Sequence, residues 1–367
     1  MHNARLAGAA LALMAIAACG DSNDPAPFDP AGTSGDLAAA ELAIMGAFDS
    51  DAGEQFALVG DFMSDLTGGG PVVVASQQLV RASFGGTDSS AARAQLTTVA
   101  KSLMKSRAPI SGSAIILPAE VLGTTYVWSD VEDTYVASDR TDAPDNGVRF
   151  AIYALDPVTH EPAAPLNELG YIDLLDLSTA SADVARIIVV SQDVTYFDYR
   201  VSLSGTENDA DVDVLGFVTD GEHRVNFDLQ NHFSFTEVSE EMGLDYELEF
   251  PNIDVTMAYN LAFSGNASGN TVELDASLRG PHGYVDLTGT ESSSEAGTTI
   301  DFLFEVNGDD FAVVNCTPDS DCLITDPQGN PLTTEEELAL ERFYGFSEAG
   351  FFLSLMLMTP AGGFMPL

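Results

Sequence analysis

Basic residues are scarce in this chain, and their scarcity limits what the protein can bind. Of 367 residues only 13 are lysine or arginine, whereas 57 are aspartate or glutamate, which gives a formal net charge of −44 at pH 7. The only lysines are Lys101 and Lys105. A chain this acidic is repelled by nucleic acid and by anionic lipid headgroups. The composition therefore excludes a nucleic-acid partner.

The excess of carboxylates has two explanations. A dense acidic surface is typical of proteins from salty habitats, where ions screen the self-repulsion that would otherwise destabilise a compact state. Alternatively, Asp209, Asp211 and Asp213 form a calcium site, because alternation along an extended segment places the three carboxylates on one side. An EF-hand loop is excluded, since Val214 and Asp220 stand where glycine and glutamate are needed. We favour the first explanation, in which the carboxylates serve general solvation of the protein surface, and we expect no cofactor. A bound calcium ion is the alternative.

Cysteine is also rare, with three residues in the whole chain. Two of them, Cys316 and Cys322, flank a short polar loop, and a disulfide that closes these seven residues would contribute about 2.4 kcal/mol in the loop-entropy model. The spacing is not C-x-x-C, and Asp319 and Asp321 would raise the pKa of the thiols. We therefore expect a structural disulfide rather than free thiols or a redox or metal site.

The apolar run near the N-terminus is shorter than a membrane-spanning helix. Residues 6–18 form 13 apolar or small residues between Arg5 and Cys19, whereas a bilayer requires about 20. A short basic segment, a short apolar run and small residues before a cleavage site are typical of a secretory signal peptide. We expect residues 1–18 to be removed.

The residues at this cleavage site, Ile16-Ala17-Ala18-Cys19, resemble the lipobox of bacterial lipoproteins. The resemblance implies that Cys19 becomes the first residue of the mature chain and carries a diacylglycerol on its sulfur and an acyl group on its amino end. Two or three acyl chains hold a protein firmly, because each buried CH₂ contributes about 0.8 kcal/mol. Gly20, in place of aspartate, implies the outer membrane by the enterobacterial sorting rule.

The segment after the anchor is rich in Asp, Pro, Gly and Ser, a composition that does not bury a core. As a flexible linker, residues 20–35 would span roughly 20–25 Å on average. We expect the folded part of the protein to hang from the membrane surface and not to enter it.

Residues 36–109 show helical periodicity. We predict a first helix, a second that begins with a capping box of Asp51 and Glu54, and a third over residues 89–107. Residues 71–84 fit either a strand or a helix. The apolar faces of the first two helices are formed by Leu37, Ile44, Met45 and Phe48, and by Phe56, Val59, Phe62, Met63 and Leu66.

Over residues 111–315 the apolar residues recur at every second position, which is typical of antiparallel strands with one apolar face and one solvent-exposed face. Short turn signals between the strands leave no room for crossover helices, so we expect a meander. The turn signals are Asp220-Gly221, Gly265-Asn266, Gly269-Asn270, Gly280-Pro281 and Asn307-Gly308. The inward positions include Val225, Phe227, Leu229, Tyr246, Leu248, Phe250, Val255, Met257, Tyr259, Leu261, Phe263, Val272, Leu274, Ala276, Leu278, Ile300, Phe302, Phe304 and Val306.

A helix is predicted near the C-terminus. Thr334 and Glu337 fit a capping box, and the helix carries Leu338, Leu340 and Phe343 on its apolar face. Residues 351–358 are almost wholly apolar but too few to span a bilayer. We interpret them as a buried element, with contact to the membrane as the alternative.

Together these patterns predict an α+β fold. It consists of N-terminal helices, a large curved antiparallel β-meander that forms an incomplete barrel or a sandwich-like sheet, and a short C-terminal helix. The predicted organisation is 1–18 signal peptide, 19–35 lipid anchor and linker, 36–109 helical segment, and 110–367 β-rich domain with the C-terminal helix. We expect the last two segments to form one globular unit.

Catalytic motifs do not emerge from the sequence. His160-Glu161 lacks the second histidine of H-E-x-x-H, and Ser347, in the nearest match to a nucleophile elbow, precedes no histidine. We therefore predict no catalytic residue and interpret the chain as a non-enzymatic lipoprotein of the cell envelope with an interaction or structural role at the cell surface. The alternatives are a carrier that holds an apolar ligand in the curved sheet and a hydrolase with dispersed catalytic residues. The expected partner is the membrane, through the N-terminal lipid.

Overall fold

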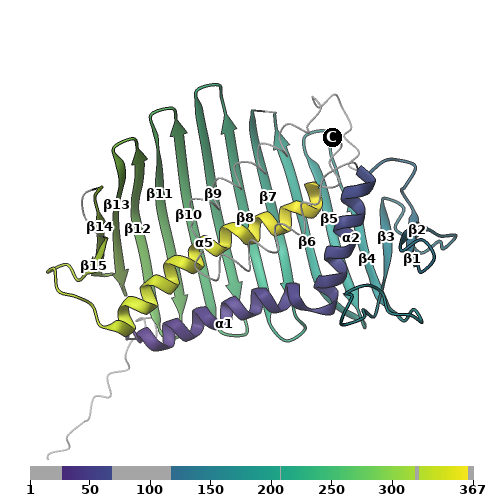
Figure 1. Cartoon of the computed structure of the whole chain (residues 1–367), viewed down its shortest axis with the longest axis horizontal. Helices are drawn as coiled ribbons and strands as arrows, with labels where there is room; N and C mark the ends of the chain where they lie inside the picture. Colours follow the sequence, from purple (N-terminus) through teal and green to yellow (C-terminus); the bar gives the residue numbers. More distant parts are fainter. Residues whose placement is uncertain (1–26, 68–116, 207, 319–321, 363–367) are drawn as a thin grey trace, which may run out of the picture.

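A single open sheet of 15 strands dominates the structure (Figure 1). The computed structural model describes residues 27–67, 117–206, 208–318 and 322–362. Neighbouring strands in the sheet follow one another along the chain from β15 back to β3, and β1 and β2 complete the other edge. Every pairing is antiparallel except that of β1 with β3, which is parallel. The predicted α+β meander with helices at both ends of the chain is confirmed.

Most strands of the middle of the sheet have ten to twelve residues, whereas both edge strands are short. Short edges present few unpaired backbone groups to other chains. The strands are β1 Thr124–Ser129, β2 Thr134–Ala137, β3 Gly147–Tyr153, β4 Glu168–Asp176, β5 Asp183–Ser191, β6 Val194–Gly205, β7 Asp209–Thr219, β8 Arg224–Phe235, β9 Ser239–Phe250, β10 Val255–Asn266, β11 Gly269–Gly280, β12 Gly283–Ser294, β13 Gly297–Val306, β14 Asp309–Cys316 and β15 Leu323–Thr325.

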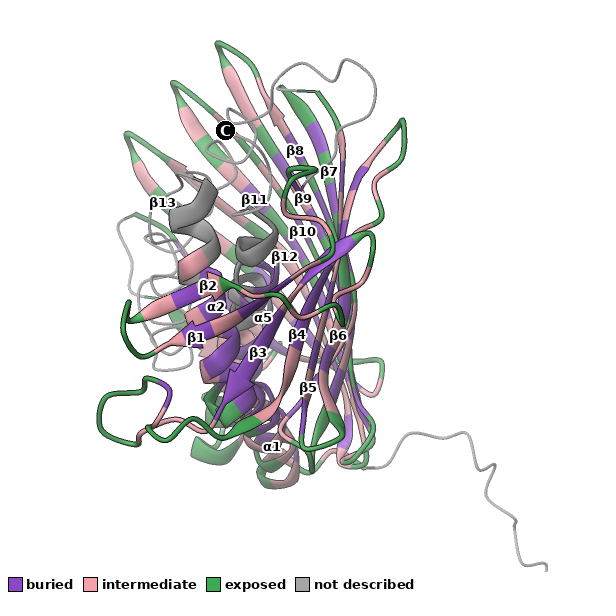
Figure 2. Ribbon diagram, turned by 90° about the vertical axis from the view of Figure 1, so that its right-hand side faces the viewer, coloured by how far each residue is buried: buried purple, intermediate pink, exposed green. Residues whose placement is uncertain are grey.

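Three helices are described: α1 Pro30–Asp49, α2 Asp51–Thr67 and α5 Thr334–Gly362. Figure 1 shows α1 along the lower ends of the strands and α5 running obliquely across the same face, and Figure 2 shows the helices together on one side of the curved sheet. Their aromatic side chains meet those of the strands: Phe56 packs on Phe197 at 5.3 Å between ring centroids, and Phe346 packs on Phe250 at 6.1 Å. No described helix is both long enough and apolar enough to cross a membrane.

The alternation of β8 to β13 places the expected apolar residues against the helices. Val225, Leu229 and Leu278 are at most 1% exposed, and Phe263 and Ile300 are partly buried at the margin of the core. The turn prediction succeeds at Asn307-Gly308, where both residues have positive φ, as a two-residue type I′ hairpin requires. The prediction is wrong at Gly265-Asn266 and Gly269-Asn270. These residues pair with each other inside β10 and β11, and the chain turns at residues 267–268 instead.

Helix boundaries differ from the predictions because other residues cap the helices. Helix α1 begins at Pro30, inside the expected linker, since Asp29 accepts a hydrogen bond from the backbone N–H of Gly32 at 3.1 Å. Helix α2 is capped by Ser50, whose Oγ accepts from the backbone N–H of Gly53 at 3.1 Å. The predicted capping box of Asp51 and Glu54 is therefore wrong.

The C-terminal helix also departs from the prediction. The capping box is formed by Thr333 and Glu336, one residue earlier than expected, with the Thr333 backbone N–H donating to Glu336 Oε2 at 2.8 Å. Helix α5 has 29 residues and includes the apolar stretch 351–358, so the prediction of a short helix is wrong. Leu340 and Phe343 are buried as expected, whereas Leu338 is 54% exposed. The third predicted helix, the ambiguous stretch 71–84 and Cys19 lie outside the described residues.

Candidate functional site

The two cysteines near the C-terminus lie at one edge of the sheet. A disulfide joins Cys316, the last residue of β14, to Cys322, which directly precedes β15, with 4.5 Å between their Cα atoms. The Cys316 side chain is buried. The bond fastens the three-residue edge strand β15 to the rest of the sheet.

The three aspartates considered as a calcium site alternate along β7 on the exposed face of the sheet. Asp211 pairs with the Nδ1 of His232 at 2.8 Å. Burial, together with the neighbouring charges of Asp211 and Asp228, raises the pKa of Asp213. Over the described ranges of the chain, no three His, Cys, Asp or Glu side chains gather closely enough to hold a metal ion. Asp209, Asp211 and Asp213 therefore form a row of carboxylates and not a cage.

Each histidine of the described chain has its Nδ1 next to a carboxylate. Such pairs fix the orientation of an imidazole but provide no nucleophile, and their hydrogen bonds do not reach a serine or cysteine side chain. Two of them join helices to the sheet: His160 contacts α2 and His282 contacts α1. The pairs are His160 with Glu54 at 3.2 Å, His223 with Asp220 at 2.9 Å, His232 with Asp211 at 2.8 Å and His282 with Asp36 at 2.8 Å.

A buried polar cluster fixes α5 on the sheet. Asn231 of β8 is 2% exposed and points toward the helices. Its Oδ1 accepts hydrogen bonds from the Tyr246 hydroxyl at 2.8 Å and the Ser354 hydroxyl at 3.1 Å, and its Nδ2 donates to the Val212 carbonyl at 3.0 Å. A fully satisfied buried network specifies one docking geometry. The sequence contained a signal for this cluster, since Asn231 occupies an inward position in an otherwise apolar series, but we did not single it out.

A second buried amide holds α2. Gln55 is 1% exposed and donates through Nε2 to the Tyr153 carbonyl at 2.5 Å, and the Tyr135 hydroxyl lies 3.5 Å from its Oε1. By contrast, Tyr199 of β6 faces the helices without a hydrogen-bond partner for its hydroxyl, the single such buried side-chain atom in the described part of the chain. Burial raises the pKa of Tyr199.

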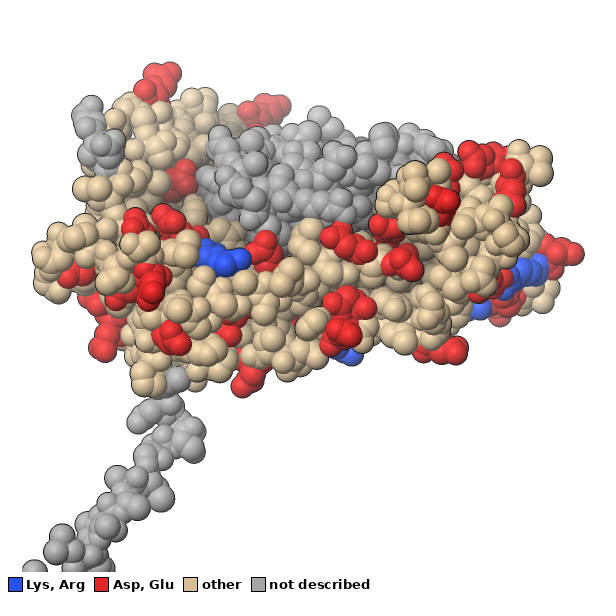
Figure 3. Space-filling model, turned by 60° about the horizontal axis from the view of Figure 1, so that its bottom comes forward, with Lys and Arg blue, Asp and Glu red and all other residues tan. Residues whose placement is uncertain are grey.

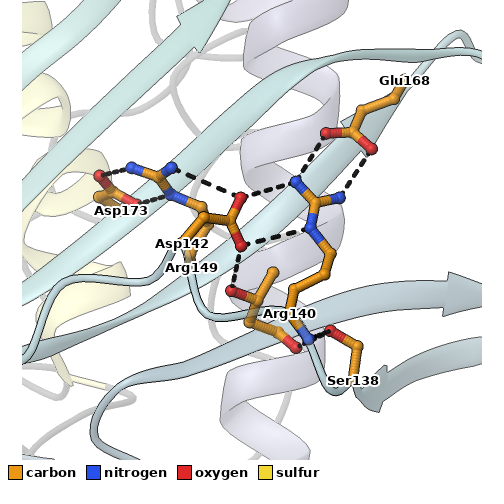
Figure 4. Close-up of polar contacts among 7 residues, drawn as sticks. Ser138, Arg140, Asp142, Arg149, Glu168 and Asp173 are labelled. Atoms are coloured by element: carbon orange, nitrogen blue, oxygen red, sulfur yellow. Dashed lines mark hydrogen bonds and ion pairs between the residues drawn. The ribbon is translucent and has the colours of Figure 1, made fainter.

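A network of five charged residues connects the segment between β2 and β3 to the sheet (Figure 4). Arg140 donates to Glu168 at 2.8 Å and to Asp142 at 2.7 Å. Arg149 donates twice to Asp173, each time at 2.7 Å, and lies 3.8 Å from Asp142. Bidentate arginine–carboxylate pairs are among the strongest polar contacts in proteins.

Asp142 lies at the centre of this network. The hydrogen bond from Arg140 lowers the pKa of Asp142 to about 2, although burial acts in the opposite direction. The guanidinium of Arg149 also stacks over the Tyr171 ring at 3.8 Å. Because both arginines are fully paired within the network, we interpret it as structural. Sequence reasoning missed it, since its partners are up to 28 residues apart and meet only through the path of the loop.

A groove of about 680 Å³ lies between the ends of three hairpins, those that join β8 to β9, β10 to β11 and β12 to β13. These hairpins end at the upper edge of the sheet, opposite α1 (Figure 1). The groove is lined mainly by Ser, Thr, Asn, Gly and Glu, with Phe263 as its aromatic residue. Its volume lies within the range of small-molecule sites.

Comparisons with known proteins identify no relative of this chain. No protein-family model matches the sequence, no characterised protein is significantly similar to it, and no solved structure has a significantly similar fold. A functional argument therefore depends on the residues and geometry described above.

Proposed function

We propose that this chain is a lipid-anchored protein of the bacterial cell envelope that acts by binding and not by catalysis. The observation that carries this proposal is the position at which the folded part begins. The backbone N–H of Asp29 donates to the His282 carbonyl at 2.9 Å, so the described chain starts at the turn between β11 and β12. The ten residues between Cys19 and Pro30 reach at most about 35 Å. The ends of the strands along which α1 lies therefore face the anchor.

The opposite ends of the strands then point away from the membrane. A strand of 12 residues such as β11 is about 40 Å long, so the hairpin ends that line the groove are separated from the anchored edge by this distance. Figure 3 shows acidic side chains spread over the lower side of the molecule and few basic ones. Repulsion between these carboxylates and anionic headgroups favours a folded body that stands off the bilayer.

Two features support binding over the alternatives. Each of the four described histidines pairs through Nδ1 with a carboxylate, as the histidine of a catalytic triad does, but none of their hydrogen bonds within the described chain reaches the serine or cysteine that a histidine base would activate. The apolar face of β6 and β7 is in contact with α1 or α5, and Phe48 and Phe56 both pack on Phe197. This part of the sheet is filled by the protein's own side chains, which disfavours an apolar ligand there.

The anchor is tested by intact-mass analysis of the protein from its native membrane and of a Cys19→Ser variant. We expect the native chain to begin at residue 19 with a diacylglycerol and an added acyl group. The variant should lack the lipid and separate from the membrane fraction. A native chain that retains residues 1–18, or that carries an unmodified thiol at residue 19, would overturn the proposal.

A further inference from the structure

On the helix-covered face, the alternation of apolar residues stops near the upper ends of the strands, where the hairpins turn. There, strand register places Glu240 opposite Gly265, and Gly265 opposite Asn270. The same row continues through Ser293 to Thr298, whose hydroxyls lie 2.8 Å apart. One row lower, the same face carries Met242, Phe263 and Val272. A polar row therefore borders the apolar core, and it crosses five adjacent strands.

The groove described above follows part of this row. Glu240, Gly265, Asn270 and Ser293 all line it, and Phe263 lies beneath them. Hairpin ends project separately from the body of the sheet in the side view (Figure 2), and most residues that line the groove are exposed. Neighbouring strands are about 4.8 Å apart, which gives an extended ligand lying across the strands several polar contacts in succession.

The floor of the groove depends on a glycine. A Cβ atom at Gly265 would lie 2.9 Å from Cζ of Phe263, so the aromatic ring extends along the strand over the space that a side chain would occupy. Gly265 has no positive φ that would require glycine at this position. The absent side chain instead leaves room for the Phe263 ring, which is partly exposed and lies in the groove beside the polar groups.

The lining residues restrict the chemistry of a ligand. Among the described residues that line the groove, three are carboxylates, Glu237, Glu240 and Glu295, and none is lysine, arginine or histidine, so repulsion disfavours an anionic ligand. Amides and hydroxyls both donate and accept hydrogen bonds, and they outnumber the carboxylates. An aromatic face packs well on apolar C–H groups. Sugars present C–H groups and many hydroxyls together.

We propose that the groove at the hairpin ends binds a neutral oligosaccharide. The Phe263 ring packs against the C–H face of one sugar, and the polar row from Glu240 to Ser293 exchanges hydrogen bonds with its hydroxyls. This inference names a ligand for the binding role proposed above, and the groove lies at the end of the sheet that faces away from the anchor. A basic peptide or polyamine is the rival ligand, because it would complement the three carboxylates.

The test is isothermal titration calorimetry on the full chain purified in a detergent without sugar headgroups. The probes are neutral hexasaccharides of glucose and of N-acetylglucosamine, with polygalacturonate as an anionic probe and spermine and polylysine as cationic probes. We expect one of the neutral hexasaccharides to bind and polygalacturonate not to bind. Binding of spermine or polylysine alone, or of no neutral hexasaccharide, would overturn the proposal.

Variants locate the binding. Asn270→Ala and Phe263→Leu should each weaken the affinity at least tenfold, and Gly265→Val should abolish binding because the new side chain displaces the Phe263 ring. Asn260→Ala is the matched control, since Asn260 is an exposed asparagine of β10 on the opposite face. Equal affinity in Asn270→Ala and Asn260→Ala would contradict the assignment. Intact-mass analysis of the same sample reports on the anchor separately, so the two proposals fail independently.

Discussion

Two buried tyrosines on the helix-covered face differ in one respect, the partner of the hydroxyl. Tyr246 donates to Asn231, whereas the Tyr199 hydroxyl has no partner among the described residues. A buried polar group without a partner costs about 1–3 kcal/mol, and a hydrogen bond contributes about 1 kcal/mol net. We therefore expect Tyr199→Phe to raise the free energy of unfolding by about 1 kcal/mol and Tyr246→Phe to lower it by a similar amount.

Urea denaturation of the two variants and the parent measures this difference, provided that the slope of the unfolding transition stays the same. The two substitutions remove the same atom from the same face of the sheet, so each serves as the control of the other. A destabilisation of equal size in both variants would show that the Tyr199 hydroxyl has a partner in solution.

A second effect at the scale of residues depends on pH. The hydrogen bond that the protonated His223 donates to the Asp220 carboxylate raises the pKa of His223 above its usual 6.5. Burial alone would raise the pKa of Asp220, but hydrogen bonds from the backbone and side chain of His223 lower it below 3.8 overall. The histidine contributes stability that is fully present below pH 6.5 and is lost as the pH rises through its folded pKa. The aspartate contributes stability that is present above pH 3.8 and is lost as the pH falls further.

The pair therefore stabilises the fold most between about pH 4 and 6.5. We expect the difference in melting temperature between the parent and a His223→Gln variant to be greatest in this window and to shrink above it. The effect is small, since both side chains are partly exposed. A difference that stays constant from pH 5 to pH 9 would contradict this account.

At the scale of elements, helix α5 offers a matched pair of apolar residues. Phe343 is fully buried in the core, whereas Leu338 is 54% exposed on the same helix. Phe343→Ala leaves a cavity and should cost about 3–5 kcal/mol, whereas Leu338→Ala should change the free energy of unfolding by less than about 0.5 kcal/mol. Chemical denaturation of both variants provides the measurement. Similar losses would show that α5 is not docked as described.

The sequence predicts the strands of this protein better than its helices. A residue such as Leu229 must face the core because its neighbours alternate, and alternation survives small errors in the strand ends. Helix ends depend on which of several adjacent Ser, Thr and Asp side chains reaches a free N–H, and Ser50 and Asp51 are equally suitable in sequence. The turn at residues 267–268 was misplaced because Gly265 and Gly269 resemble turn residues but serve as strand residues.

The sites were harder to predict than the fold. The role of Asn231 could have been predicted from the alternation pattern, since a polar residue at an inward position must find hydrogen-bond partners. The contact of Arg140 with Glu168 joins the segment between β2 and β3 to the first residue of β4, and no periodicity describes the path of such a segment. The groove requires the register of three hairpins at once, because Glu240, Gly265 and Asn270 become neighbours only when every strand pair between them is aligned.

At the scale of the whole molecule, the dominant feature is the net charge of −44. If the carboxylates serve general solvation, screening should strengthen the fold, because the Debye length falls from about 10 Å at 0.1 M to about 3 Å at 1 M salt. We therefore expect the melting temperature to rise when sodium chloride is increased over this range at pH 7. Potassium chloride should have the same effect, since screening depends on ionic strength and not on the identity of the cation.

A calcium site would respond differently. Binding to the native state stabilises it in proportion to the logarithm of ligand concentration over the dissociation constant, so micromolar calcium would raise the melting temperature at constant ionic strength. The carboxylates of Asp209, Asp211 and Asp213 alternate along one strand and do not form a cage, so we expect no such rise. A variant with all three changed to Asn is the control. A calcium-dependent rise in the parent that is absent from this variant would reverse our preference and assign a metal to β7.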